Sequence, residues 1–226
     1  MIDELKTWQR RQDTHFLLAG FGSSNTDLSW HSQGRLTWFC WLSSCIRYHV
    51  GKHVEAVNCG ICGDTTEQLL TRFGRDITPL RPSMTIVTIG GNDFARLSLD
   101  AYRSNLARIV EQLRALGSRV VLQTYYSPML AAQDLARFDT YMEAVRATAR
   151  ESSSMCIDHY PEMKALWQRD PDGYRAVMQD EMHLNPIGNA AFGALCCRSF
   201  GLPDPEWPAE SADAITAAIS RISTAV

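Results

Sequence analysis

Five short apolar runs alternate along the chain with segments of helical periodicity, and this alternation constrains the fold more than any other feature. The runs lie at residues 16–22, 54–57, 84–89, 119–126 and 154–160. The third, MTIVTI, is almost continuously apolar, as expected of a strand covered on both faces. Strands that alternate with helices are joined by right-handed crossovers. The pattern therefore predicts an α/β fold with a mainly parallel sheet and helices on both faces.

Local signals predict where several helices begin. Asp64 is expected to cap a helix that runs through residues 65–73. Apolar residues at helical spacing predict a long helix over residues 98–116. Asn185 and Pro186 are the residue types that favour the N-cap and the first turn of a helix, so another helix is expected from there.

Composition limits the class of function. The chain has 226 residues, 45% of them hydrophobic and 21% charged, which fits one globular domain over residues 1–226. A net charge of −3 gives no indication of the basic surface that nucleic-acid-binding proteins carry. No segment reaches the roughly 20 apolar residues of a membrane span. The first 14 residues carry early acidic residues and no apolar core, unlike a signal peptide.

The cysteines bear on the compartment and on one alternative function. The chain has seven of them, an odd number, which with no signal peptide predicts reduced thiols and a cytoplasmic protein. Cys59 and Cys62 form a C-x-x-C pair, which leaves open a redox pair or half of a zinc site. A closed zinc site needs two further ligands at suitable spacing, so no metal or cofactor is expected.

A serine-rich turn follows the first apolar run. Two glycines close the run, and Ser23, Ser24, Asn25 and Thr26 come next. The glycines allow a sharp turn. A serine at the carboxyl end of such a strand faces the crevice where open α/β sheets bind ligands. The same residues also suit an ordinary turn or helix N-cap, so the stretch alone does not identify a nucleophile.

Four more residues make a reaction plausible. Gly63 lies in NCGICGDT, Asn92 in GGND, and Asp180 and His183 in DEMH. Ester cleavage needs a nucleophile, a base, a group that orients the base, and donors for the oxyanion. Asp180 can accept from Nδ1 of His183 and leave Nε2 for Ser24. The backbone N–H groups of Ser24 and Gly63 and the side-chain amide of Asn92 are candidate oxyanion donors.

In the order and spacing of these blocks, the chain resembles the SGNH, or GDSL-type, hydrolases. The four blocks here are GSSNT, NCGICGDT, GGND and DEMHLN, and together they span most of the chain. The resemblance implies a flavodoxin-like three-layer sheet and a serine hydrolase that acts on small-molecule esters. It also implies Ser24 as the nucleophile, His183 as the base oriented by Asp180, and an oxyanion hole completed by Gly63 and Asn92.

One position departs from the family pattern. Ser23 stands where the family usually has the Asp of Gly-Asp-Ser. The Ser23 hydroxyl can accept from a neighbouring backbone N–H, so we expect it to brace the turn. On that hypothesis, Ser23→Ala costs about 1 kcal/mol of stability, the scale of one hydrogen bond.

Two other functions stay open at this point. An acyltransferase of the same fold would use the same residues with an alcohol in place of water. Phosphate binding at a helix N-terminus is disfavoured, since no glycine-rich fingerprint has the expected spacing.

Aromatic residues near the expected crevice are candidates for contact with substrate. They include Trp30, Phe94 and Tyr126, with His31 and Tyr125 beside them. Packing in a second layer explains these residues equally well. Neither the acyl group, the alcohol nor the oligomeric state follows from the sequence.

Overall fold

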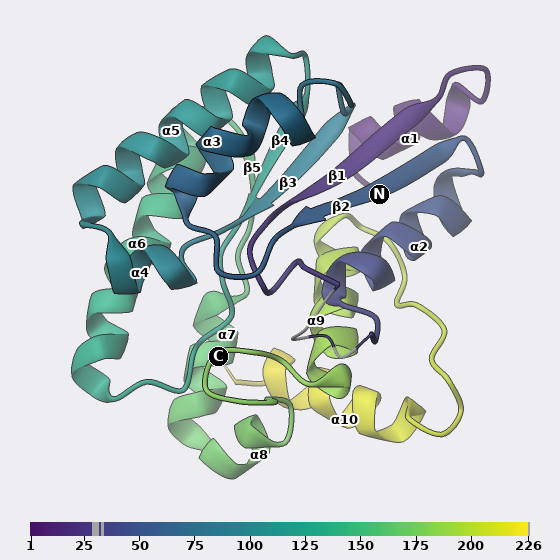
Figure 1. Ribbon diagram of the computed structural model, residues 1–226. Helices are drawn as coiled ribbons and strands as arrows, with labels where there is room; N and C mark the ends of the chain where they lie inside the picture. Colours follow the sequence, from purple (N-terminus) through teal and green to yellow (C-terminus); the bar gives the residue numbers. More distant parts are fainter. Residues whose placement is uncertain (29–31, 33, 226) are drawn as a thin grey trace.

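The computed structural model describes residues 1–28, 32 and 34–225 (Figure 1). In this part of the chain, five parallel strands form one sheet in the order β2-β1-β3-β4-β5. The strands are β1 (Phe16–Gly22), β2 (Val54–Gly60), β3 (Met84–Thr88), β4 (Arg119–Gln123) and β5 (Met155–Ile157). The parallel sheet confirms the predicted α/β class, and its strand order is that of flavodoxin-like folds.

Helices cover both faces of the sheet, as predicted. On one face α2 packs against α9, with α1 beside α2 and α10 beside α9 (Figure 1). The bounds of these four helices are α1 Asp3–Arg10, α2 Trp38–Val50, α9 Pro186–Ser199 and α10 Ala212–Ser223.

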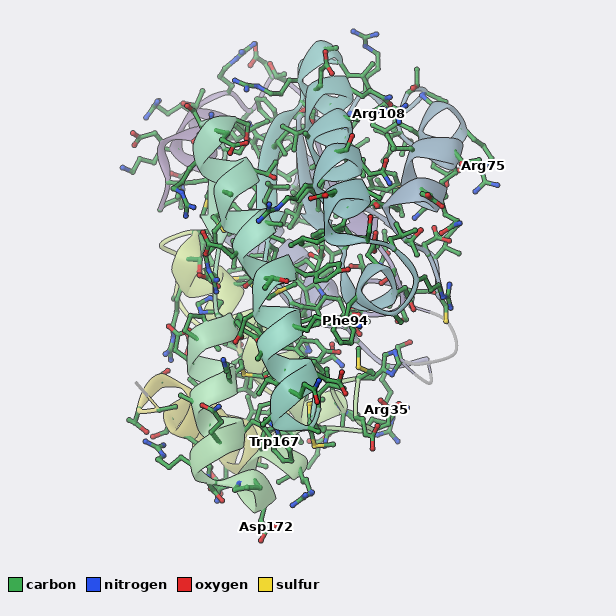
Figure 2. All side chains as sticks on the ribbon, turned by 90° about the vertical axis from the view of Figure 1, so that its left-hand side faces the viewer. Arg35, Arg75, Phe94, Arg108, Trp167 and Asp172 are labelled. Carbon is green, nitrogen blue, oxygen red and sulfur yellow. The ribbon has the colours of Figure 1, made fainter. Side chains whose placement is uncertain are left out.

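The opposite face carries α3, α5 and α6, and Figure 2 shows the last two side by side. Three shorter helices, α4, α7 and α8, complete the set in the described residues. The bounds are α3 Thr66–Asp76, α4 Gly91–Arg96, α5 Leu99–Ala115, α6 Ala132–Glu151, α7 Tyr160–Arg169 and α8 Pro171–Arg175. None of the helices in the described part of the chain is both long and apolar enough to cross a bilayer.

The strand order places a crevice at the carboxyl ends of β1 and β3. The chain leaves β1 for the neighbour on one side, β2, and then crosses to β3 on the other. Gly22 at the end of β1 lies in register with Gly60 of β2 and Thr88 of β3. Loops that leave adjacent strands in opposite directions open a cleft between them, which is where doubly wound sheets bind ligands.

The cap of α3 differs from the sequence prediction. Thr65, and not Asp64, is the N-cap, and it forms a capping box with Gln68. Asp64 instead accepts from the Arg72 guanidinium at 2.6 Å. Asp and Thr both favour the N-cap position. Which of Asp64 and Thr65 takes it depends on their partners one to two helical turns further along the chain.

The start of α9 confirms the predicted cap. The Asn185 side chain accepts from the Gly188 N–H at 2.9 Å, and Pro186 is the first helical residue. Deeper in α9, a Cβ on Gly193 would lie only 2.6 Å from Cβ of Trp41 on α2. A glycine at this position therefore lets the two helices approach closely. Their contact fixes α9, the helix that follows residues 176–185, which form the histidine loop.

Candidate active site

Ser24 lies on a tight turn directly after β1. The turn is closed by the Ser23 carbonyl, which accepts from the N–H groups of Thr26 at 2.9 Å and Asp27 at 3.0 Å. Ser24 is 8% exposed, so its hydroxyl faces a confined space. In the described residues, the backbone N–H of Ser24 has no acceptor.

A histidine from the far end of the chain meets this serine. His183 Nε2 lies 2.9 Å from Ser24 Oγ, although 159 positions separate the two residues. His183 Nδ1 lies 2.9 Å from each carboxylate oxygen of Asp180. The structure thus brings together the three side chains that the sequence suggested, in the order hydroxyl, imidazole, carboxylate.

Backbone donors hold the Asp180 carboxylate. Oδ1 accepts from the N–H groups of Met182 and His183, both at 2.8 Å. Partial burial raises the pKa of this carboxyl, but the N–H donors and the imidazole outweigh it and leave the pKa below the usual value. Asp180 is therefore ionised near neutral pH and able to accept from the imidazole.

Further backbone contacts fold the histidine loop. The His183 carbonyl accepts from the Gln179 N–H at 2.8 Å, and the Asn185 N–H donates to the Val177 carbonyl at 3.0 Å. Outside the loop, the Met129 N–H donates to the Glu181 carbonyl at 2.9 Å. The loop is thus tied both to itself and to the segment that leaves β4.

Gly63 follows β2, the strand next to β1. Its φ of +85° lies in the left-handed region that favours glycine, and its carbonyl accepts from the Arg96 guanidinium at 2.8 Å. No acceptor for the Gly63 N–H lies among the described residues. The backbone of this loop thus leaves one donor for a ligand.

Asn92 follows β3, on the other side of β1. Its side-chain amide donates to the Asp64 carbonyl at 2.9 Å, which uses one of two N–H bonds. The second N–H is left for another acceptor. Ser24, Gly63 and Asn92 therefore follow three adjacent strands at the same edge of the sheet.

The Ser23 side chain does not brace the turn as the sequence suggested. It is fully buried, and its hydroxyl makes no hydrogen bond to the turn but interacts with the hydroxyl of Tyr125. The bracing atom is the Ser23 carbonyl, which is part of the backbone and independent of residue type. The sequence-based expectation that the Ser23 side chain braces the turn is therefore wrong.

We expect Ser23→Ala to change the free energy of unfolding by less than about 1 kcal/mol, because the hydroxyl makes no hydrogen bond to the turn. The change in kcat should stay below tenfold. Urea unfolding of both proteins measures the first quantity. A loss of stability of 1 kcal/mol or more would mean that the hydroxyl is bonded in solution.

The aromatic residues near the site have different environments. Phe94 is half-buried under Arg137, whose guanidinium carbon lies 4.0 Å from the ring centroid, and Figure 2 shows Phe94 beyond the end of α5. Tyr125 and Tyr126 are each only 2% exposed. Trp30 and His31 lie outside the described residues.

Sequence reasoning missed Arg72 of α3. It is 7% exposed, pairs with Asp64 at 2.6 Å and Asp76 at 2.9 Å, and donates to the Gly22 carbonyl at 3.0 Å. Arg72 thus joins the end of β1 to the loop that carries Gly63. The available signal was its place in LLTRF, where it shares the apolar helix face with Leu69.

Asp93, beside Asn92, was also missed. It is fully buried, and Oδ1 accepts from the backbone N–H of Thr66 at 2.8 Å and from its hydroxyl at 2.6 Å. Burial raises the pKa of this carboxyl. Asp93 thereby ties the first turn of α4 to the start of α3. An acidic residue after a Gly-Gly pair gives no sequence signal of burial.

The C-x-x-C pair lacks the features of a reactive thiol. Cys59 is half-buried and Cys62 is exposed. Burial, and for Cys62 also the charges of Asp27 and Asp64, raise the pKa of both thiols. Reactive cysteines need a lowered pKa. No metal-binding group of three His, Cys, Asp or Glu side chains is found within the described residues.

Comparison with known proteins identifies the family. The GDSL-like Lipase/Acylhydrolase family matches residues 21–191. The chain belongs to this family. An acetylxylan esterase of Geobacillus stearothermophilus is 28% identical over 171 residues, which cover 68% of this chain and 74% of that enzyme. Membership confirms the resemblance found in the four motifs, and it makes the chain a carboxylic ester hydrolase.

Solved structures of family members share the fold. Axe2, an acetylxylan esterase from Geobacillus stearothermophilus, superposes with a TM-score of 0.74 at 19% identity and covers 86% of this chain and 98% of its own. A GDSL-like lipase structure from Parabacteroides merdae ATCC 43184 has a TM-score of 0.73 at 15% identity, covering 83% and 96%. At these identities the likeness concerns the fold.

Proposed function

We propose that this GDSL-family hydrolase cleaves carboxylic esters through an acyl-enzyme on Ser24. The observation that carries the proposal is the continuous chain of hydrogen bonds from Ser24 Oγ through His183 to the Asp180 carboxylate, with each distance 2.9 Å. In this scheme Ser24 is the nucleophile, His183 is the general base and Asp180 fixes the imidazole tautomer.

The proposed chemistry has two symmetric halves. Ser24 Oγ attacks the ester carbonyl carbon while His183 Nε2 takes the hydroxyl proton, and the imidazolium then returns that proton to the departing alcohol. Water next attacks the acyl-enzyme with the same base, and the acid leaves as Ser24 regains its proton. The ionised Asp180 stabilises the imidazolium in both halves.

The oxyanion requires donors that are already in place. We assign this role to the backbone N–H groups of Ser24 and Gly63 and to the second N–H of the Asn92 amide. Support comes from the two backbone N–H groups, which lack acceptors in the described residues, and from the Asp64 carbonyl, which orients the Asn92 amide. Donors oriented before the reaction stabilise the developing charge without reorganisation.

The substrate proposed is an ester with a short acyl group, with acetylated sugars as the first class to test. Related enzymes are named acetylxylan esterases, and catalytic mutants of Axe2 replace a serine and an aspartate with alanine. A series of p-nitrophenyl esters of increasing acyl length tests this assignment.

Covalent labelling tests the nucleophile. A fluorophosphonate probe should modify Ser24, and peptide mapping should place the adduct there. Ser24→Ala should abolish both labelling and ester hydrolysis, whereas the neighbouring control Ser23→Ala should still be labelled. An adduct on Ser23, or hydrolysis that persists in Ser24→Ala, would refute the assignment.

Acyl transfer to an alcohol would use the same residues. Incubation of an activated ester with and without added alcohol separates the two outcomes by their products.

The cytoplasmic location stays a prediction. The uncharacterized lipoprotein YqeF of Bacillus subtilis (strain 168) is 32% identical over 79 residues, which are 32% of this chain and of that protein, so a lipoprotein occurs among its relatives.

A further inference from the structure

One buried hydroxyl contacts both halves of the proposed catalytic site. Tyr126 Oη lies 2.6 Å from Asn25 Oδ1 and 2.8 Å from the Met182 carbonyl, and it accepts from the Leu184 N–H at 3.2 Å. Asn25 directly follows the proposed nucleophile, and Met182 and Leu184 flank the proposed base. A single oxygen atom therefore joins two loops that are far apart in the chain.

The rest of the structure fixes the position of this hydroxyl. Tyr126 lies three residues beyond the end of β4 and is 2% exposed. Its ring packs against Tyr125, with centroids 5.2 Å apart, and meets the edge of Phe192 on α9 at 5.6 Å. The sheet and α9, and not the histidine loop, thus determine where the hydroxyl lies.

The histidine loop needs such an anchor. It has little regular structure, with an isolated bridge between Met178 and Leu184 in the described residues. In general, loops are more mobile than the elements they connect. A displacement of about 1 Å in a reacting group can cost about 10²-fold in rate.

We propose that Tyr126 is a positioning residue that sets the distance between Ser24 and His183 by holding both loops on one hydroxyl. The proposal rests on the proposed function. A hydroxyl suits the task because it accepts one hydrogen bond and donates another. Leu184 supplies the donor, and Asn25 Oδ1 and the Met182 carbonyl share the single proton.

This role differs from direct contact with substrate. The Tyr126 hydroxyl donates its proton to protein groups and accepts a hydrogen bond from the Leu184 N–H. Burial raises the pKa of the phenol, so the hydroxyl keeps its proton at working pH. Tyr126 therefore acts through the neighbours of Ser24 and His183.

Tyr126→Phe removes the hydroxyl and keeps the ring. We expect kcat on a p-nitrophenyl ester to fall about 10–100-fold with KM within about twofold, because orientation and not binding is lost. The rate of fluorophosphonate labelling should fall by a similar factor. Tyr160→Phe is the control, since Tyr160 is also 2% exposed as a residue and its hydroxyl bonds Asp139 at 2.7 Å, away from the proposed catalytic loops.

The Tyr160→Phe control separates a loss of catalytic positioning from a general loss of stability. Both variants should lower Tm, but Tyr160→Phe should keep kcat within about twofold. Equal falls of kcat in the two variants, or a Tyr126→Phe enzyme that keeps more than half of kcat, would overturn the role. If Tyr126→Phe does not fold, Asn25→Ala removes the acceptor beside the nucleophile instead. It should lower kcat about tenfold, and unchanged kcat would overturn the role.

A Ser24→Ala arm in the same assay distinguishes failure of the proposed function from failure of the proposed role of Tyr126. An active Ser24→Ala enzyme would refute the proposed function and the role of Tyr126 with it. An inactive Ser24→Ala enzyme beside a fully active Tyr126→Phe enzyme would refute the role of Tyr126 alone.

Discussion

Replacement of His183 by alanine should lower kcat for ester hydrolysis by about 10⁴–10⁶-fold, the usual loss when the base of such a unit is removed. The imidazole is the group within hydrogen-bond distance of Ser24 Oγ, at 2.9 Å, that can take its proton. Stopped assays at high enzyme concentration measure the residual rate. His49→Ala, at a histidine on α2, is the control and should keep full activity.

The same base predicts the pH dependence of the native enzyme. Neutral imidazole accepts a proton and imidazolium does not, so kcat/KM should rise with pH as the His183 imidazolium loses its proton. The pKa of Asp180 is held below its usual value, so this carboxylate stays charged while the imidazole titrates. Activity should therefore fall on acidification through protonation of histidine first. A flat profile between about pH 5 and 8, or a His183→Ala loss below 100-fold, contradicts the role.

Replacement of Arg72 by methionine should lower the free energy of unfolding by about 3–5 kcal/mol, because it leaves a buried carboxylate without its partner. The Arg72 and Asp64 side chains are 7% and 12% exposed and lie 2.6 Å apart. The substitution also removes the donor to the Gly22 carbonyl and the contact of the guanidinium with the Phe21 ring, 4.7 Å from its centroid. Urea unfolding measures the loss.

Arg75→Met on the same helix is the matched control. Arg75 also pairs with Asp76, but its side chain is 69% exposed, and exposed ion pairs contribute little to stability. If Arg72→Met cost no more than Arg75→Met, the buried pair would not be a structural link. Loss of activity in folded Arg72→Met enzyme would follow from displacement of the Gly63 loop relative to β1.

The periodicity of apolar residues was enough to predict the class of fold. MTIVTI at residues 84–89 alternates with amphipathic segments, and strands joined by helices have few arrangements other than a parallel sheet. Asn185 followed by Pro186 likewise specified a helix start, because both signals act within one turn. The pairing of Asp180 with His183 is also local, since residues three apart in a turn lie side by side.

The four motifs predicted the candidate site, but not the contacts that hold it. Ser24 and His183 are 159 positions apart, and their 2.9 Å contact exists only because β1 and the loop before α9 end at the same edge of the sheet. In the sequence, Tyr126 is one of several aromatic residues near the expected crevice, and no local signal distinguishes it from the others. Its role depends on three partners from two distant loops.

Where two adjacent residues had similar local preferences, partners distant in the sequence decided which of them took each structural role. Asp64 and Thr65 are both good N-caps, and the chain uses Thr65 because Arg72 binds Asp64. Ser23 has a hydroxyl that bonds readily in an isolated turn, yet the folded turn uses its carbonyl and leaves the hydroxyl buried. Local sequence signals were enough to predict the strands, several of the helices and the motif residues of the candidate site. Tertiary packing decided which of their polar atoms found partners, because a buried hydrogen bond requires a partner that only the folded chain brings within reach.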